Sequence, residues 1–371
     1  MTDKGLREVV AAETKISDID GQQGRLWYAG YDIVDLAEHA TFEEVAFLLH
    51  HVELPTRTEL DELTAFLVAE RELSPFLTEM MPTLAQQTSP MSMLRTTVSA
   101  ASAYDPDGWD ESPEAQYRKA MRLIAMMPPI IARYHRLRTG QAVLETDPKL
   151  GHAANFLWML LGARPDDEAT RAMNLSFVLY ADHTMNASTF TARIIASTLA
   201  DMFSAITGAI GCLKGPLHGG ANEESMKMLE EVDKPKNAEA YVSDRLDRKQ
   251  KIFGFGHAVY TTMDPRARIF KEWSRRVGES RGDPKWFEIS EAIEHATFEQ
   301  KGLYPNVDFY AASVYHVLGI PTDLMTPIFT LARMVGWTAH VREQYADNRV
   351  IRPDSDYIGP PERSYVPLDE R

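Results

Sequence analysis

Apolar residues recur at intervals of three and four along nearly the whole chain, and this period constrains the fold more than any other feature. One helix start is explicit, because Thr41 and Glu44 have the spacing of a capping box. The apolar residues that follow at helical spacing are Val45, Phe47, Leu48 and Leu49, and then Leu60, Leu63, Leu67 and Val68. Prolines and glycines at positions 90, 113, 128, 129, 140 and 148 divide the chain into segments of helix length. The sequence predicts an all-α fold.

Two segments qualify this picture. Residues 16–21 and 25–28 flank a turn-rich gap and predict a small hairpin near the N-terminus. Residues 187–213 form the longest apolar tract, which is interrupted by Arg193 and Asp201 and is rich in small residues. It predicts a buried helix of a soluble protein and not a membrane span. Its small residues would allow a neighbouring helix to approach closely, either within one subunit or at a subunit interface.

Length and charge limit the classes of protein that fit. A chain of 371 residues exceeds the usual size of a single core, so two lobes are expected. The 39 Lys and Arg against 54 Asp and Glu give a net charge of -15, which argues against nucleic-acid and membrane binding. An anionic ligand would need a local arginine cluster. The single cysteine, Cys212, and an N-terminus without the apolar core of a signal peptide favour a cytoplasmic protein.

A change in composition predicts where the lobes divide. Near Gly215 the long apolar tract gives way to a more charged region that runs to about Ala311, and beyond Pro321 the chain is apolar and helical again. We therefore predict a large helical domain of residues 1–216 and 314–371, and a small helical domain of residues 217–313 inserted into it.

Residues 216–222 place His218 on a glycine hinge, with Asn222 as the expected N-cap of the next helix. The partial positive charge of a helix N-terminus disfavours imidazolium, and a neutral ring can donate a hydrogen bond to a developing oxyanion. The alternative is a loop histidine that only caps backbone groups. This segment alone leaves both open.

Three further positions have side chains suited to chemistry: His183, His257 and Asp308. They are too far apart for a local metal motif, and the sequence has neither His-Glu-x-x-His nor paired cysteines. Gly254 and Gly256 precede His257, but a third glycine and a βαβ pattern are missing, which excludes a Rossmann nucleotide site. Asp308 has the alternative of simply capping the helix expected at residues 309–318.

Three arginines are candidates for holding an anion. Asp264 and Pro265 form a helix start, and Arg266 in its first turn would reinforce an anion-binding terminus unless it is a surface residue. Arg333 lies in an apolar stretch that follows a helix start predicted at Thr326, so it either reaches the surface or binds a carboxylate. Spacing does not decide the role of Arg352.

Taken together in their order along the chain, several of these segments resemble the short, dimeric prokaryotic members of the citrate synthase family. The segments are residues 19–26, 177–191, 213–222, 254–266, 304–310, 336–340 and 351–353. The resemblance implies a citrate synthase-like, two-domain helical homodimer. Its cleft would close on oxaloacetate and then admit acetyl-CoA.

The resemblance also implies catalytic roles. Asp308 would remove a proton from the acetyl methyl group while His218 donates a hydrogen bond to the thioester oxygen. His257 would polarise and protonate the oxaloacetate carbonyl. Because an aspartate of ordinary pKa, about 3.9, is a weak base for a carbon acid, Asp308 and His218 must act in the same step.

Binding roles follow in the same way. His183, Arg266 and Arg333 would hold the oxaloacetate dicarboxylate, and Asn186 would shape the pocket. Arg352 would reach in from the partner subunit.

The adenine of CoA is expected to contact the backbone of the segment formed by Lys251, Ile252, Phe253, Gly254, Phe255 and Gly256. Ala258 stands where many short relatives carry arginine, so a phosphate contact from that position is absent. No metal and no permanently bound cofactor is implied, and acetyl-CoA serves as cosubstrate. The rival functions are 2-methylcitrate synthase with propionyl-CoA, a zinc hydrolase built on the three histidines and Asp308, and a non-catalytic helical scaffold.

Overall fold

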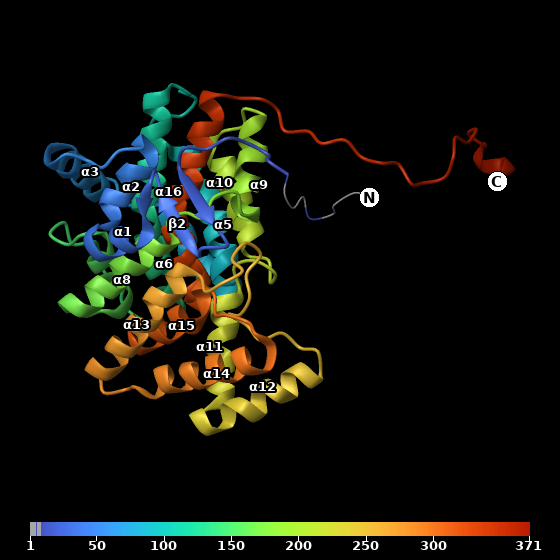
Figure 1. Ribbon diagram of the computed structural model, residues 1–371. Helices are drawn as coiled ribbons and strands as arrows, with labels where there is room; N and C mark the ends of the chain where they lie inside the picture. Colours follow the sequence, from blue (N-terminus) through green and yellow to red (C-terminus); the bar gives the residue numbers. More distant parts are fainter. Residues whose placement is uncertain (1–4, 6–8) are drawn as a thin grey trace.

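The computed structural model describes residue 5 and residues 9–371, and within them the fold is almost entirely helical (Figure 1). The α-helices are α1 (Ile33–His39), α2 (Phe42–His51), α3 (Arg57–Ala69), α4 (Pro75–Gln87), α5 (Pro90–Ala101), α6 (Pro113–Arg138), α7 (His152–Leu161), α8 (Asp167–Tyr180), α9 (Ala187–Ser197), α10 (Met202–Leu213), α11 (Ala221–Val232), α12 (Ala238–Asp247), α13 (Pro265–Ser280), α14 (Lys285–Lys301), α15 (Val307–Val317) and α16 (Met325–Ala346). Short 3-10 helices are η1 (Ser102–Tyr104), η2 (Pro235–Asn237), η3 (Thr322–Leu324) and η4 (Leu368–Glu370). The prediction of an all-α fold is confirmed.

The predicted hairpin is confirmed, and a short third strand extends it. β1 (Ser17–Asp20) pairs antiparallel with β2 (Arg25–Tyr28), and β2 pairs antiparallel with β3 (Tyr31–Asp32). The buried Tyr28 side chain donates its hydroxyl to the backbone oxygen of Asp182, 2.9 Å away. The sheet thus supports the turn that follows α8.

Several helix starts agree with the sequence. The Thr41 side chain accepts from the backbone of Glu44, and the Glu44 side chain accepts in return, which completes the predicted capping box of α2. Pro90 and Pro113 occupy the first helical positions of α5 and α6.

The helix break predicted at Pro128 and Pro129 is wrong, because α6 continues through both prolines to Arg138. Both residues are buried in α6, which packs against α4, α7 and α16. Burial against three helices compensates for the lost backbone hydrogen bonds.

The single helix predicted for residues 187–213 is also wrong, since α9 and α10 are separate. Leu199 has a φ of 61°, a left-handed conformation that ends the first helix. The Asp201 side chain then accepts from the backbone N–H of Ser204 and caps α10. The buried Arg193 is paired with Glu343 at 2.6 Å, so this charge inside an apolar helix has a partner.

The buried helix α16 lies at the centre of the helices formed by the first part of the chain. α16 contacts α2, α5, α6, α8, α9 and α10, and nearly all of its residues are buried. The helices α11, α12 and α14 gather at the opposite end of the molecule, with α13 and α15 between them and the rest (Figure 1). The division into two domains at residues 217–313 remains a prediction.

Within the described residues, no helix is long and apolar enough to cross a membrane. After α16 the chain leaves the helices as an exposed segment that extends away from the body of the molecule (Figure 1). Arg352 lies in this segment.

Candidate active site

One cleft, of about 740 Å³, is lined by every predicted site residue except Arg352. The residues come from the turn after α8, the start of α9, the loop before α11, the loop that precedes α13, and the starts of α13 and α15, with α16 beneath. The folding of the chain therefore brings into one cleft residues that are far apart in the sequence, such as His183 and Arg333.

Asp308 lies in the first turn of α15, but it does not cap this helix. The cap is Asn306, whose side chain accepts from the backbone N–H of Asp308 at 3.1 Å. The Asp308 carboxylate is therefore free to face the cleft, where burial raises its pKa to about 6 against a smaller lowering by a hydrogen bond from Tyr180. A raised pKa makes this carboxylate a stronger base than an ordinary aspartate.

His218 is held in the tight turn before α11. A side chain on the neighbouring Gly219 would meet the backbone oxygen of Leu213 at 2.4 Å, so the turn requires glycine there. Burial, with a smaller contribution from the Arg333 charge, lowers the pKa of His218 to about 4. The ring is therefore neutral, as expected. The causes are burial and the Arg333 charge, whereas the neutrality expected from the sequence was attributed to the helix N-terminus. The N-cap predicted at Asn222 is wrong, because the cap is Gly220 and Asn222 is buried within α11.

Ser188 fixes the orientation of the His218 ring through an Oγ to Nε2 distance of 2.9 Å. Trp337 Nε1 can only donate, and it donates to Ser188 Oγ at 3.2 Å. Ser188 then has one hydrogen to give, either to His218 Nε2 or to Asn186 Oδ1, which lies 2.8 Å away. When His218 receives it, the hydrogen of the neutral ring is on Nδ1.

The tautomer of His257 is set by the backbone. Its Nδ1 accepts from the N–H groups of Val259 at 3.0 Å and Tyr260 at 3.3 Å, so the hydrogen of the neutral ring is on Nε2. Burial and the Arg266 charge lower the pKa of His257 to about 4. His257 therefore offers an N–H donor and carries no charge.

The glycine loop that carries His257 is joined to the start of α15. Gly254 accepts from the backbone N–H of Asn306 at 2.8 Å, and Asn306 Nδ2 donates to the oxygen of Gly256 at 3.0 Å. Both glycines have positive φ, 76° and 75°. The loop and Asp308, two residues beyond Asn306, are thus joined by these hydrogen bonds.

His183 faces His257 across the cleft, with ring centroids 5.1 Å apart. Its Nε2 lies 3.2 Å from the hydroxyl of Tyr260. Burial and the neighbouring Arg266 hold the pKa of His183 well below its usual range, so this ring too is neutral.

Two buried guanidinium groups line the cleft. Arg266 follows the predicted helix start, where Asp264 caps α13 and pairs with the guanidinium at 2.8 Å. Arg333 donates from Nε to the backbone oxygen of Tyr180 at 2.7 Å and reaches the cleft from α16, not the surface. The α16 helix begins at Met325, one residue before the predicted start. Buried guanidinium groups in a cleft suit a ligand with carboxylates.

Asn186 lines the cleft but its side chain caps α9, accepting from the backbone of Ser188 and Thr189. Arg352 lies outside the cleft: its side chain is 81% exposed and is 3.5 Å from Asp354. Its contribution across a subunit interface stays a prediction.

The sequence did not predict the side chains that contact His218, His183 and Asp308 in the cleft. Ser188 and Tyr260 each contact a histidine of the cleft, and Tyr180 contacts Asp308. Tyr260 is only three residues after His257, so its place near the histidines of the cleft could have been inferred from the sequence. Ser188 and Tyr180 become neighbours of their partners only through the fold.

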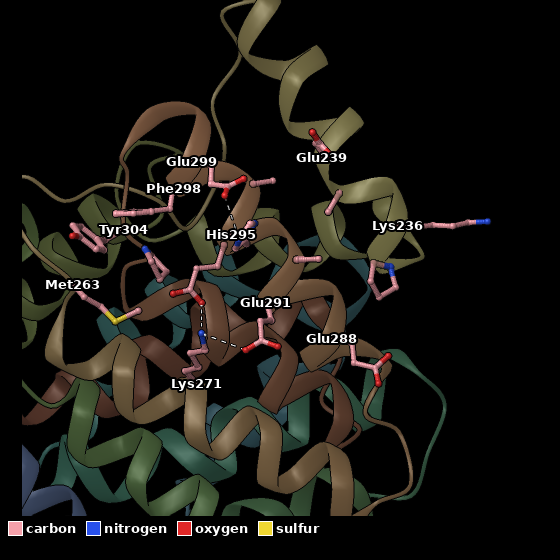
Figure 2. Close-up of a pocket in the computed structure, with 16 residues that line it drawn as sticks. Lys236, Glu239, Met263, Lys271, Glu288, Glu291, His295, Phe298, Glu299 and Tyr304 are labelled. Atoms are coloured by element: carbon pink, nitrogen blue, oxygen red, sulfur yellow. Dashed lines mark hydrogen bonds and ion pairs between the residues drawn. The ribbon is translucent and has the colours of Figure 1, made fainter.

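A second cavity, of about 830 Å³, lies among η2, α12, α13 and α14 (Figure 2). Within it, Lys271 lies 2.7 Å from Glu294 and 3.7 Å from Glu291, and His295 lies 3.4 Å from Glu299. None of the predicted site residues lines it. In the described part of the chain, no group of three or more His, Cys, Asp and Glu side chains is arranged to hold a metal ion.

Comparison with known proteins agrees with this geometry. A family model described as "Citrate synthase, C-terminal domain" matches residues 5–354. A protein of Haloferax volcanii named citrate synthase is 49% identical, with 99% of this chain and 98% of that protein covered. One of Shewanella oneidensis named 2-methylcitrate synthase is 43% identical, with 100% and 98% covered. The crystal structure of citrate synthase from Pyrobaculum aerophilum superposes with a TM-score of 0.92 at 43% identity, covering 99% of this chain and 95% of that one.

Proposed function

The chain belongs to the citrate synthase family, and from this membership we propose how its residues condense acetyl-CoA with oxaloacetate and hydrolyse the resulting citryl-CoA to citrate and CoA. The observation that supports the assignment most strongly is the cleft itself. It combines a carboxylate of raised pKa, two uncharged histidines with pKa values near 4 and two buried arginines.

In the first step Asp308 takes a proton from the acetyl methyl group, and His218 donates a hydrogen bond to the thioester oxygen as negative charge develops there. A neutral imidazole donor suits this role because its own charge does not have to be buried. The His218 tautomer with hydrogen on Nδ1, which Ser188 allows, presents that donor. Both groups must act together, since neither alone overcomes the weak acidity of the methyl group.

In the second step the methylene carbon attacks the ketone carbon of oxaloacetate. The Nε2–H of His257 polarises the ketone oxygen and supplies its proton. Arg266 and Arg333 pair with the two carboxylates, and His183 with Tyr260 positions the substrate beside them. Water then cleaves the citryl thioester in the same cleft. Closure of the proposed small domain (residues 217–313) over the large one would exclude bulk water during condensation.

We place the CoA adenine against the backbone of residues 251–256, which line the same cleft. The proposed enzyme uses acetyl-CoA as a cosubstrate and no resident cofactor or metal. The assembly we propose is a cytoplasmic homodimer in which Arg352 of each chain completes the dicarboxylate site of the other. The exposed position of Arg352 in this single chain fits that arrangement.

The test is the release of free thiol from acetyl-CoA. We expect thiol to appear at enzymatic rates with oxaloacetate and only at background rates without it. Thiol release that is independent of oxaloacetate would instead indicate a thioesterase.

A second candidate, 2-methylcitrate synthase, is favoured by the 43% identity to the Shewanella oneidensis protein. One methylene in an apolar pocket changes transition-state binding by only about 1–3 kcal/mol, so a few side chains decide the preference. The ratio of kcat/KM for acetyl-CoA to that for propionyl-CoA distinguishes the two. A ratio above one supports citrate synthase.

A further inference from the structure

We infer that Tyr180 is a positioning residue for the catalytic base: its hydroxyl, held by Asn222, fixes Oδ1 of Asp308 and leaves Oδ2 for the acetyl methyl proton. This inference rests on the proposed function, because it takes Asp308 as the base.

The hydrogen-bond directions follow from the groups involved. The Tyr180 hydroxyl lies 2.9 Å from Asp308 Oδ1, and Asn222 Nδ2 lies 3.0 Å from the same hydroxyl. An ionised carboxylate only accepts, and an amide nitrogen only donates. The tyrosine oxygen therefore accepts from Asn222, and its single hydrogen goes to Asp308 Oδ1 at 2.9 Å, which is closer and charged, and not to the backbone oxygen of Val307 at 3.4 Å. Donation into the hydroxyl oxygen also strengthens its own donation to the carboxylate.

Tyr180 is itself rigidly placed. Its side chain is fully buried at the end of α8, with its ring centroid 4.6 Å from that of Phe329 and 5.8 Å from that of Phe270. Its backbone oxygen accepts from Arg333 at 2.7 Å. One residue therefore ties the base to an arginine of the dicarboxylate site, and the separation between proton acceptor and substrate is fixed through it.

The charged and titratable groups around Asp308 set the direction of the effect. Arg266 and Asp264 face it from α13, Arg333 from α16 and Tyr180 from α8, while α11 contributes the uncharged Asn222. Tyr315, on the same helix as Asp308, feels the Asp308 charge.

Burial raises the pKa of Asp308, and the hydrogen bond from Tyr180 is the largest influence that lowers it. The pKa of Tyr180 is held well above 10, so its hydroxyl stays protonated and remains a donor. Removal of this hydroxyl must therefore raise the pKa of the base further.

The test is the pH profile of kcat/KM for acetyl-CoA in Tyr180→Phe, a change that keeps the ring. Loss of one hydrogen bond to a buried carboxylate is expected to move the acidic limb upward by about one pH unit from its position near pH 6. Activity should fall about fivefold at pH 6 and about twofold at pH 7, and recover to within about twofold of wild type by pH 8.5. KM for oxaloacetate should not change.

Tyr315→Phe is the matched control, because it removes another buried tyrosine hydroxyl, which contacts Ser176, close to the same aspartate. Its acidic limb should coincide with that of the wild type. Asn222→Ala should move the acidic limb in the same direction as Tyr180→Phe, by a smaller amount. In this variant the Tyr180 hydroxyl still donates to Asp308 but no longer accepts from the Asn222 amide that orients it.

Equal fractional loss at every pH in Tyr180→Phe, or an unmoved acidic limb, would overturn the inference. Asp308→Asn separates this outcome from failure of the proposed function. If Asp308→Asn is inactive while the limb of Tyr180→Phe stays in place, Asp308 is the base and Tyr180 does not position it. If Asp308→Asn turns over normally, the assignment of the base itself is wrong.

Discussion

Alanine substitutions at Gly254 and Gly256 test whether the glycine loop fixes the positions of His257 and Asp308 relative to each other. Both have left-handed backbone, with φ of 76° and 75°, so an alanine at either position carries a conformational strain of about 1–2 kcal/mol. They differ in the space around them. A Cβ on Gly254 would lie 2.7 Å from both Phe309 Cβ and Ser225 Oγ, whereas one on Gly256 would meet only Leu303 Cδ2, at 3.9 Å.

The magnitude follows from this difference. Gly256→Ala should cost about 1–2 kcal/mol. Gly254→Ala should cost a further 1–3 kcal/mol or so, because overpacking forces Phe309 or the loop to move. Phe309 adjoins Asp308, the proposed base, and the loop carries His257. We therefore expect the total penalty in Gly254→Ala to appear partly as lower stability and partly as a loss of kcat/KM of about 10- to 100-fold.

Two assays at one protein concentration measure the effect: urea unfolding, and kcat/KM for acetyl-CoA at saturating oxaloacetate. Gly302→Ala is the control, since Gly302 has a φ of 66° and open space around its would-be Cβ, at the end of α14. It should lose stability only. Equal penalties in Gly254→Ala and Gly256→Ala, in both assays, would refute the claim that close packing under the loop sets the geometry of the site.

Three other predictions concern single groups. Asp308→Ala should abolish condensation while titration calorimetry shows oxaloacetate binding within a few-fold of wild type; turnover near the normal rate would reject the assigned base. The acidic limb of wild-type kcat/KM should fall near pH 6, where Asp308 becomes protonated; a limb near pH 4 would mean that burial does not perturb the base. His152 is fully buried, and both its ring nitrogens lack a hydrogen-bond partner among the described residues, so its pKa is held well below 6.5. Below pH 6.5 the unfolded chain therefore binds a proton that the folded chain does not. The free energy of unfolding accordingly decreases as the pH is lowered below 6.5. Between pH 7 and pH 5 the free energy of unfolding, measured in urea, should fall by about 2 kcal/mol less in His152→Leu than in the wild type. An identical pH dependence in the two proteins would contradict this.

Local chemistry made much of the fold predictable from the sequence. The capping box at Thr41, the N-cap and proline at Asp264 and Pro265, and the turn-rich gap of the hairpin are signals that act over a few residues. All three elements are present. The failures have a common cause in tertiary contacts. Burial of α6 carries the helix through Pro128 and Pro129, and the cap at Asp201 divides α9 from α10.

The same distinction applies to the site. Residues such as His218 and His257 stand out because glycines surround them in the sequence. The local cap rules were less reliable: the sequence predicted Asn222 as a helix cap and left capping open for Asp308, but the caps are Gly220 and Asn306. The supporting contacts of Ser188 and Tyr180 join segments 30 and 128 residues apart, and no local pattern announces them.

The proposed enolisation by Asp308 and His218 is tested most directly by exchange of the acetyl-CoA methyl protons with solvent deuterium. The exchange is measured in the presence of an oxaloacetate analogue that cannot be condensed. This measurement isolates the proposed step, in which Asp308 would take the proton and His218 would stabilise the thioester oxygen. We expect rapid exchange in the wild type and a fall to near background in both Asp308→Ala and His218→Ala. Exchange that survives in either variant at the wild-type rate would contradict the claim that these two side chains perform the enolisation together.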